Sequence, residues 1–185
     1  MALITTPNMA QPIFLIGYMG CGKSTLARAL AKYTGLQFID LDNYIERRFM
    51  ANVRDIFARY GEERFRDMEH RMLLEVADFE NVIIACGGGT PCFHNNMEII
   101  NTHGTSIWLQ ASDSILHHRL VRGRHKRPLL AEKTDDEIMQ IIRTGLQQRL
   151  PFYSRAHHTF CTDTLETVEE IRATTRQFIQ QFLPQ

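Results

Sequence analysis

Apolar residues along this chain are grouped into short runs that alternate with longer segments of helical spacing. The first run, residues 12–16, is apolar throughout and ends at Gly17, which predicts a buried strand. Four later runs predict further strands, over residues 36–40, 82–86, 105–109 and 158–162. The chain is therefore expected to contain five strands.

The segments between these runs carry apolar residues at three- and four-residue spacing, which predicts helices. The first follows the Gly-rich residues 17–25 and ends at Gly35. The segment 43–79 is highly charged with apolar stripes, and Gly61 is expected to divide it into two helices. Further helices are predicted over residues 93–103, 114–122, 134–150 and 168–182.

Strands that alternate with helices predict an α/β fold, a parallel sheet covered by helices on both faces. Thr134 is the predicted N-cap of the helix over 134–150, and Pro151 is expected to stop that helix. There is no internal repeat and no linker long enough to separate domains, so residues 1–185 are expected to form one domain. Residues 1–11 are expected to form a loose tail, because they lack the basic start and the long apolar core of a secretory signal.

Composition and charge exclude several classes of protein. Of the 185 residues, 44% are hydrophobic and 23% are charged, which is typical of a globular domain and not of a disordered chain. Lys plus Arg and Asp plus Glu both number 21, so no basic excess indicates a nucleic-acid partner. No apolar run reaches the roughly 20 residues that a membrane-spanning helix needs, and no membrane partner is expected.

The four cysteines predict neither a disulfide framework nor a zinc site. They are Cys21, Cys86, Cys92 and Cys161. None forms a CxxC pair, and their spacings match no zinc motif. Reduced thiols in a cytoplasmic protein are the simplest interpretation.

The Gly-rich stretch 17–25 reads GYMGCGKST and fits the phosphate-binding pattern GxxxxGK[ST] between a predicted strand and a predicted helix. Its glycines let successive backbone N–H groups turn toward phosphate oxygens, and the following helix adds its positive N-terminal end. Lys23 is placed to reach the β- and γ-phosphates, and the Ser24 hydroxyl is placed to ligate Mg²⁺. The motif predicts an ATP site but not the reaction.

Two classes of nucleotide-binding protein are compatible with this motif: a small-molecule kinase and a GTPase switch. A GTPase normally carries an Asn-Lys-x-Asp string that reads guanine and an Asp-x-x-Gly switch. Neither string occurs in this chain. The kinase is therefore favoured.

Asp40 and Asp42 stand at the end of the second predicted strand. Residues i and i+2 of a strand point to the same face, so both carboxylates could face a ligand at the carboxyl edge of the sheet. One could hold a water on Mg²⁺, and the other could accept a proton from an acceptor hydroxyl. The alternative is that Asp42 is the N-cap of the helix that follows.

Other candidate residues carry weaker signals. The run 87–89 of three glycines permits close approach to a ligand or forms a strained turn, and Cys86 stands where an acidic residue usually ends such a strand. Arg66 and Arg149 are either ligand clamps or surface charges. The basic loop between residues 119 and 127 is either a solvated charge run or a lid over polyphosphate.

Taken together, these strings resemble the shikimate kinase family. The likeness runs from about residue 11 to residue 183, and the order and spacing of the strings make it more specific than the phosphate-binding loop alone. The strings are GYMGCGKST at 17–25, DLD at 40–42, GEERFRDME at 61–69, GGG at 87–89, RPLL at 127–130 and RLPFY at 149–153.

The resemblance implies a three-layer P-loop kinase fold, like that of nucleoside monophosphate kinases, with a five-stranded parallel sheet of order 2-3-1-4-5. It implies an acceptor-binding lobe at about 42–79 and a lid at about 122–133. It also implies transfer of the ATP γ-phosphate to the 3-hydroxyl of shikimate, giving shikimate 3-phosphate and ADP in the route to aromatic amino acids. A Mg²⁺-dependent, cytoplasmic and monomeric enzyme is expected.

The resemblance also implies residue roles. The implied ATP-binding residues are Gly20, Cys21, Gly22, Lys23, Ser24, Thr25 and Arg127. The implied shikimate-binding residues are Asp42, Arg66, Gly88, Gly89 and Arg149. The implied catalytic residues are Lys23, Asp42 as the base, and Arg127 from the lid; the implied metal-site residues are Ser24 and Asp40. A kinase for gluconate, or a nucleoside monophosphate kinase, remains the alternative, because specificity between small acids is hard to read from sequence.

Overall fold

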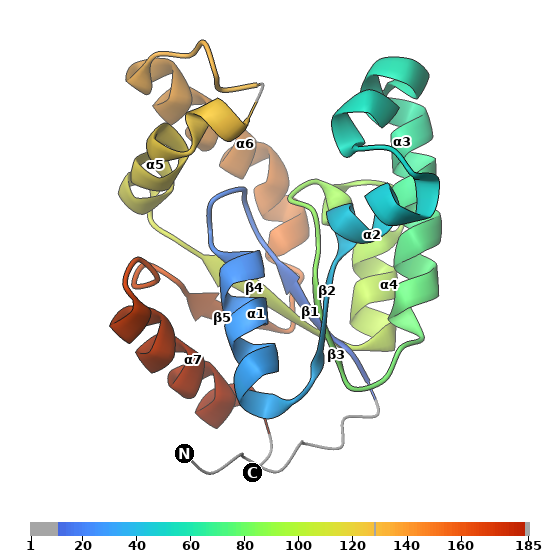
Figure 1. The fold of residues 1–185 in the computed structure, drawn as a ribbon, viewed down its shortest axis with the longest axis vertical. Helices are drawn as coiled ribbons and strands as arrows, with labels where there is room; N and C mark the ends of the chain where they lie inside the picture. The colour runs from blue at the N-terminus through green and yellow to red at the C-terminus, as the bar shows by residue number, and fades with distance from the viewer. Residues whose placement is uncertain (1–10, 128, 184–185) are drawn as a thin grey trace.

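The computed structural model describes residues 11–127 and 129–183. Its centre is a five-stranded parallel sheet of order β2-β3-β1-β4-β5, which confirms the predicted fold (Figure 1). The strands are β1 Ile13–Ile16, β2 Gln37–Asp40, β3 Val82–Ala85, β4 Thr105–Gln110 and β5 His158–Cys161. The predicted tail over residues 1–11 lies almost wholly outside the described residues, and so does Pro128 of the RPLL string.

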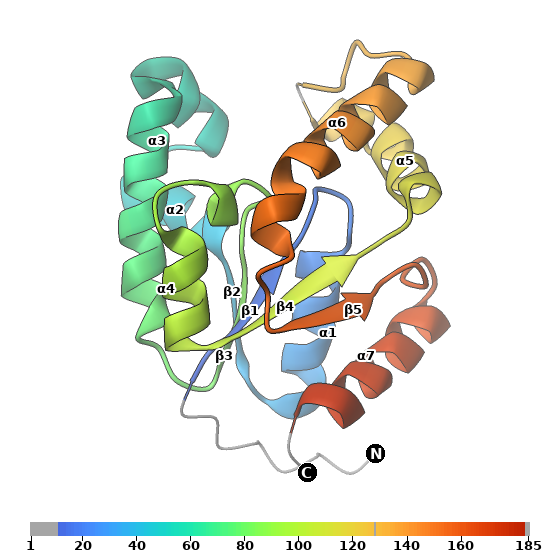
Figure 2. The same cartoon turned by 180° about the vertical axis from the view of Figure 1, so that it is seen from behind.

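Helices cover both faces of the sheet, as the alternating pattern predicts. They are α1 Lys23–Thr34, α2 Leu41–Phe49, α3 Val53–Ala77, α4 Asn96–His103, α5 Asp113–Arg122, α6 Asp135–Tyr153 and α7 Val168–Phe182. Helices α1 and α7 lie together on one face, and α4 lies on the other, as Figures 1 and 2 show from opposite sides. Short 3-10 helices, Thr90–Cys92 and Arg124–Lys126, complete the elements.

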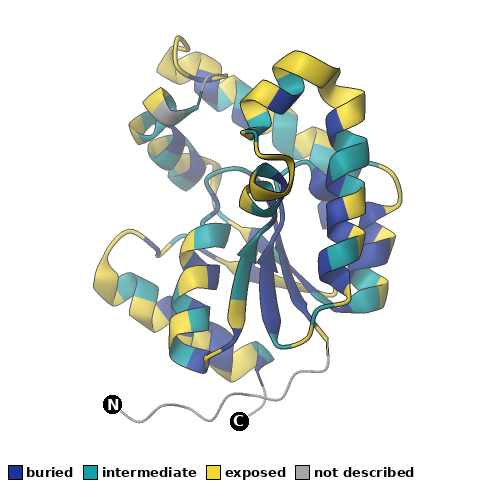
Figure 3. Ribbon diagram, turned by 45° about the vertical axis from the view of Figure 1, so that its right-hand side comes forward, coloured by how far each residue is buried: buried dark blue, intermediate teal, exposed yellow. Residues whose placement is uncertain are grey.

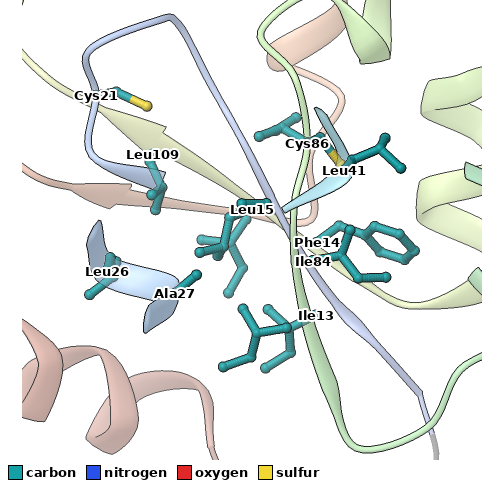
Figure 4. Close-up of a cluster of buried hydrophobic side chains, with 14 of the residues drawn as sticks. Ile13, Phe14, Leu15, Cys21, Leu26, Ala27, Leu41, Ile84, Cys86 and Leu109 are labelled. Carbon is teal, nitrogen blue, oxygen red and sulfur yellow. The ribbon is translucent and has the colours of Figure 1, made fainter. Parts of the chain in front are cut away.

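The core lies on both sides of the central strand β1. All four of its residues are buried, and alternate side chains point to opposite faces of the sheet. Figure 4 shows Leu15 on the side of Leu26 and Ala27 from α1, and Phe14 on the other side. Figure 3 shows burial concentrated in the sheet and the inner faces of the helices, with exposed residues on the outer turns. The buried sheet therefore fixes the positions of the loops that leave the carboxyl ends of its strands.

The charged segment 43–79 is divided differently from the prediction. Helix α2 ends at Phe49, its C-cap Met50 has a left-handed backbone (φ 51°), and Asn52 caps α3 by accepting from the Asp55 N–H. Gly61 (φ 79°, ψ 173°) is non-helical and divides α3 into two helical parts, which confirms the predicted break. The prediction missed the additional break between α2 and α3, because the left-handed residue that follows α2 is a methionine, for which the sequence carries no turn signal.

Helix α6 also differs, since it runs through Pro151 to Tyr153 and does not stop near Leu150. The proline removes one backbone donor, yet the Ser154 N–H still donates to the Leu150 oxygen, so the helical turn continues. The start of α6 is as predicted: Thr134 caps it, and Glu137 completes a capping box. The extra turn places Tyr153 in the core beside the candidate site.

Candidate active site

The stretch between β1 and α1, residues 17–22, forms the phosphate-binding loop that the motif predicts. Gly20 and Gly22 have φ values of 86° and 95°, which side-chain-bearing residues rarely adopt. Gly22 caps α1 without a side-chain hydrogen bond, so the first N–H groups of the helix stay available to an anion. The Lys23 side chain folds back over the loop, and its Nζ donates to the Gly17 oxygen at 2.8 Å and to the Tyr18 oxygen at 3.0 Å.

A cavity of about 430 Å³ opens beside this loop at the carboxyl edge of the sheet. It brings together residues from the β1–α1 and β2–α2 connections, from the end of β3, from α5 and the loop after it, and from the loop before α7. The lining includes Gly20, Gly22, Lys23, Ser24, Thr25, Asp40, Asp42, Cys86, Gly87, Gly88, Arg119, Arg127, Leu165 and Glu166. Of the implied site residues, Arg66, Gly89 and Arg149 do not line this cavity, and Cys21 lines a second one.

Two oxygen groups that could ligate Mg²⁺ lie side by side on the wall of the cavity. The Ser24 hydroxyl donates to the Asp40 Oδ2 at 2.7 Å. Mg²⁺ is usually held by one or two such oxygens together with phosphates and waters, so these two groups fit it. Within the described part of the chain, no group of three or more His, Cys, Asp or Glu residues forms an all-protein metal site.

Asp40 and Asp42 both face the cavity, although not for the reason that the strand pattern suggests. The strand ends at Asp40, which caps α2 by accepting from the Asn43 N–H at 3.4 Å, and Asp42 lies in the first turn of that helix. Asp40, and not Asp42, is therefore the helix cap. This leaves the Asp42 carboxylate without a capping role and directed into the cavity.

The environment of Asp42 raises the pKa of its carboxyl to about 6. Burial is the main cause, and the nearby carboxylates of Glu69 and Asp40 add to it, while Lys23 opposes the shift. A carboxyl with a pKa near 6 is ionised at neutral pH and is still basic enough to accept a proton from a hydroxyl.

The two arginines lie on either side of the glycine run, which joins them into one cluster. A Cβ built on Gly88 would lie 3.1 Å from the Arg149 Nη1, and one built on Gly89 would lie 2.8 Å from the Arg66 Nη2. Any side chain at Gly89 would therefore displace the arginine. The Tyr153 hydroxyl donates to the Gly88 oxygen at 2.6 Å and holds the run in place.

Arg66 is fixed in one orientation and is not a surface charge. Its side chain is 14% exposed, its Nη1 donates to Glu69 Oε2 at 2.8 Å, and its guanidinium lies 3.9 Å from the centre of the Phe93 ring. Glu69 is itself buried and accepts from the Thr90 hydroxyl at 2.6 Å. The Arg66 Nε is buried and has no hydrogen-bond partner among the described residues.

Arg127 reaches the cavity from the loop after α5. It is partly buried, donates to the Gly123 oxygen at 3.3 Å, and makes no ion pair within the part of the chain that the structure describes. The loop itself is held at its base: Arg124 donates to the Lys133 oxygen and to Asp135. Leu130 is buried, so the loop is not simply a solvated charge run.

A group on the nucleotide side of the cavity was not assigned to the site from the sequence, although Arg119 was counted in the basic run 119–127. Arg119 of α5 donates to Glu166 at 2.6 Å and to the backbone oxygens of Gly20 and Thr162, and Leu165 lies beside Gly22. No motif marks these residues, because they come from separate elements and meet only in the fold. Cys86 also lines the cavity, and burial raises the pKa of its thiol, which is therefore a neutral wall group.

Comparisons with known proteins agree with this geometry. The family described as shikimate kinase matches residues 19–181. A shikimate kinase from Phocaeicola vulgatus is 50% identical over 161 residues, which cover 87% of this chain and 92% of that protein. The chain belongs to the shikimate kinase family. A Bacteroides fragilis member is 46% identical over 89% of this chain and 92% of its own.

Solved structures of the family share the fold over almost the whole chain. The crystal structure of shikimate kinase from Bacteroides thetaiotaomicron superposes with a TM-score of 0.89 at 44% identity, covering 92% of this chain and 97% of the other. Shikimate kinase from Acinetobacter baumannii, solved in complex with shikimate, has a TM-score of 0.80 at 32% identity, covering 94% and 93%. Among the described residues, no helix is long and apolar enough to cross a membrane.

Proposed function

We propose that this chain transfers the γ-phosphate of ATP to the 3-hydroxyl of shikimate, giving shikimate 3-phosphate and ADP. The observation that carries the proposal is the order of groups around the site: a phosphate-binding loop, then the partly buried Asp42 carboxylate, then two arginines beside a glycine run. This order suits a phosphoryl donor next to a small carboxylate-bearing polyol. Membership of the shikimate kinase family supports the same substrate.

At the donor end, the backbone of Gly20–Thr25 and the start of α1 would bind the ATP phosphates, and Lys23 would move from the loop oxygens to the β- and γ-phosphates. Ser24 and Asp40 would hold Mg²⁺, which when bound neutralises phosphate charge. Arg127, with no ion pair among the described residues, would supply a further positive charge from the lid over about 122–133. Stabilising charge on the transferred group is the main catalytic task in phosphoryl transfer.

At the acceptor end, Arg66 and Arg149 would bind the shikimate carboxylate, with the backbone of Gly88 and Gly89 beside it. Guanidinium groups suit a carboxylate because their N–H donors can pair with both of its oxygens. Asp42 would orient the sugar-like hydroxyls and accept the proton of the attacking one. Asp42 and Arg66 belong to the lobe over about 42–79, which we propose as the acceptor-binding lobe, and Arg149 comes from α6.

The chain offers every group of this site by itself, so we propose that it acts as a monomer. Its four cysteines, Cys21, Cys86, Cys92 and Cys161, are free thiols, which supports a reducing, cytoplasmic location.

The proposed reaction is tested by measuring ADP release with Mg²⁺-ATP and shikimate, gluconate, AMP or CMP offered in parallel. We expect turnover with shikimate and little with the other three. Gluconate is the sharpest comparison, because it is also a carboxylate polyol and would satisfy the arginines. Equal or faster turnover of gluconate would overturn the assignment of substrate and leave the fold and the phosphate site intact.

Replacing Arg66 with lysine is expected to raise the shikimate KM about tenfold. Lysine keeps the charge but loses the planar fork, which we propose pairs with the carboxylate and which stacks on Phe93. The ATP KM should stay within about twofold. Arg64→Lys is the matched control, since Arg64 lies on the same helix with its side chain 54% exposed. A normal shikimate KM in Arg66→Lys would return Arg66 to a structural role.

The raised pKa of Asp42 predicts opposite pH trends for activity and stability. The base must be ionised, so kcat/KM measured with both substrates below saturation should fall as the pH drops through about 6. The folded carboxyl holds its proton more tightly than the unfolded one, so its contribution to stability is full below about pH 4 and is lost as the pH rises to about 6. A pH profile without an acid limb near 6 would contradict the role of Asp42 as base.

A further inference from the structure

Tyr18 is the second residue of the phosphate-binding loop. Its side chain packs against helix α6 and does not line the phosphate cavity. Its side chain is almost fully buried, and its hydroxyl donates to the backbone oxygen of Ile141 at 3.0 Å. This contact joins the loop after β1 to a helix that begins more than a hundred residues later. It links the donor side of the site to the element that carries Arg149.

Helix α6 has a gap at Gly145 that the Tyr18 ring fills. A Cβ built on Gly145 would lie 2.7 Å from the Tyr18 Cε2 and 2.9 Å from its Cζ, so no side chain fits there while the ring is in place. Glycine inside a helix weakens it relative to alanine. The helix therefore has an unfavourable residue at the position where the ring needs the space.

Ile141, Gly145 and Arg149 follow one another at intervals of four residues, so they lie on one face of α6. The Arg149 guanidinium lies 4.9 Å from the centre of the Tyr18 ring, in a cation–π contact. Arg149 makes no ion pair with a described residue. The ring thus holds the arginine without neutralising it and leaves its charge for a ligand.

The space around the ring argues against a purely core role. On one side Tyr18 borders a cavity of about 480 Å³, lined also by Trp108, Leu146 and Leu150. On its other sides Tyr18 packs in the same apolar core as Ile142 and Tyr153 of α6. The ring itself spans the distance between the two elements.

We propose that Tyr18 is a positioning residue for acceptor binding: seated in the gap at Gly145, it sets the place of Arg149 relative to the phosphate-binding loop. This inference rests on the proposed function, because it takes the acceptor carboxylate as the ligand of Arg149. The fixed relation keeps the acceptor aligned with the phosphoryl group bound a few residues along the same loop.

The test is a double-mutant cycle with Tyr18→Leu, Gly145→Ala and the double variant. Tyr18→Leu should raise the shikimate KM about tenfold, while the ATP KM changes by less than about twofold. Gly145→Ala should raise the shikimate KM to a similar degree, because its methyl group displaces the ring. In the Tyr18→Leu background the same Gly145→Ala change should add less than about twofold, since no ring remains to be displaced.

Tyr33→Leu is the matched control, because Tyr33 lies partly buried at the far end of α1 and should leave the shikimate KM within about twofold. Calorimetric titration of shikimate gives a second readout that does not depend on turnover. If the parent neither binds nor phosphorylates shikimate, the proposed function fails. If the parent does both, the positioning role is overturned by a normal shikimate KM in Tyr18→Leu, by an equal rise in the ATP KM, or by additive effects in the double variant.

Discussion

Replacing Lys23 with alanine is expected to lower kcat about a thousandfold, which corresponds to about 4 kcal/mol of lost transition-state stabilisation. The ammonium group now donates to two backbone oxygens of the loop, at 2.8 and 3.0 Å, and is poised at the cavity wall. Phosphoryl transfer offers little covalent chemistry for the protein to perform, so charge placed on the transferred group carries most of the catalysis. Steady-state ADP release with saturating substrates measures the effect.

Lys32→Ala is the matched control for this variant. Lys32 lies exposed in the last turn of the same helix, nine residues along, and is far from the cavity lining. Its loss should leave kcat within about twofold, although it removes a favourable charge at the carboxyl end of α1. A Lys23→Ala enzyme with kcat within a few-fold of the parent would mean that the loop is not a catalytic phosphate site.

Replacing Asp42 with asparagine is expected to lower kcat with shikimate by a factor of about a hundred to a thousand. The amide keeps the shape of the side chain, but it cannot accept a proton at neutral pH. Nucleotide binding, followed by titration with ADP, should stay within a few-fold, because Lys23 and Ser24 carry the phosphates in the proposed mechanism. Loss of kcat with retained ADP affinity would place Asp42 on the acceptor side of the reaction.

The stability of Asp42→Asn separates a catalytic role from damage to the fold. The pKa of Asp42 is raised because its charge is buried near other carboxylates, so the ionised form lowers stability at pH 8. The neutral amide should therefore have a Tm at pH 8 no lower than that of the parent. Asp78→Asn, at an exposed position at the end of α3, is the control and should change neither kcat nor nucleotide binding. Unchanged kcat in Asp42→Asn would reduce that residue to a structural one.

Much of the fold could be predicted from the sequence because it depends on local patterns. The apolar run before Gly17 must be buried on both faces, which requires helices on both sides of the sheet. The alternation of such runs with helical segments leads to a parallel sheet. Capping is equally local: Thr134 and Thr167 each have a glutamate three residues on, and both form capping boxes. The phosphate-binding loop belongs to the same group, because its glycines, lysine and serine are contiguous.

Local patterns failed at two helix boundaries. Met50 takes a left-handed backbone that its side chain does not favour, and α6 continues through Pro151. In the second case the Tyr153 side chain is buried and bonded to the Gly88 oxygen, and that tertiary contact favours the extra turn over the local preference. The boundaries of helices near the site were therefore the least predictable part of the fold.

The sequence alone determined the class of fold, the phosphate-binding loop and, through its family resemblance, the residues to examine: Lys23, Asp42, Arg66 and Arg149 among them. Only the tertiary structure decided which of these share a site, that Asp40 and not Asp42 caps α2, and that Arg119 and Glu166 join the nucleotide side. It also decided the state of Asp42, because a pKa depends on burial and on charges brought close by folding. The spacing of apolar residues along the chain specifies helices and strands, because their hydrogen bonds and exposed faces are set locally or by regular patterns. The pKa of a site residue and the geometry of a ligand site depend instead on distances between residues that are remote in sequence.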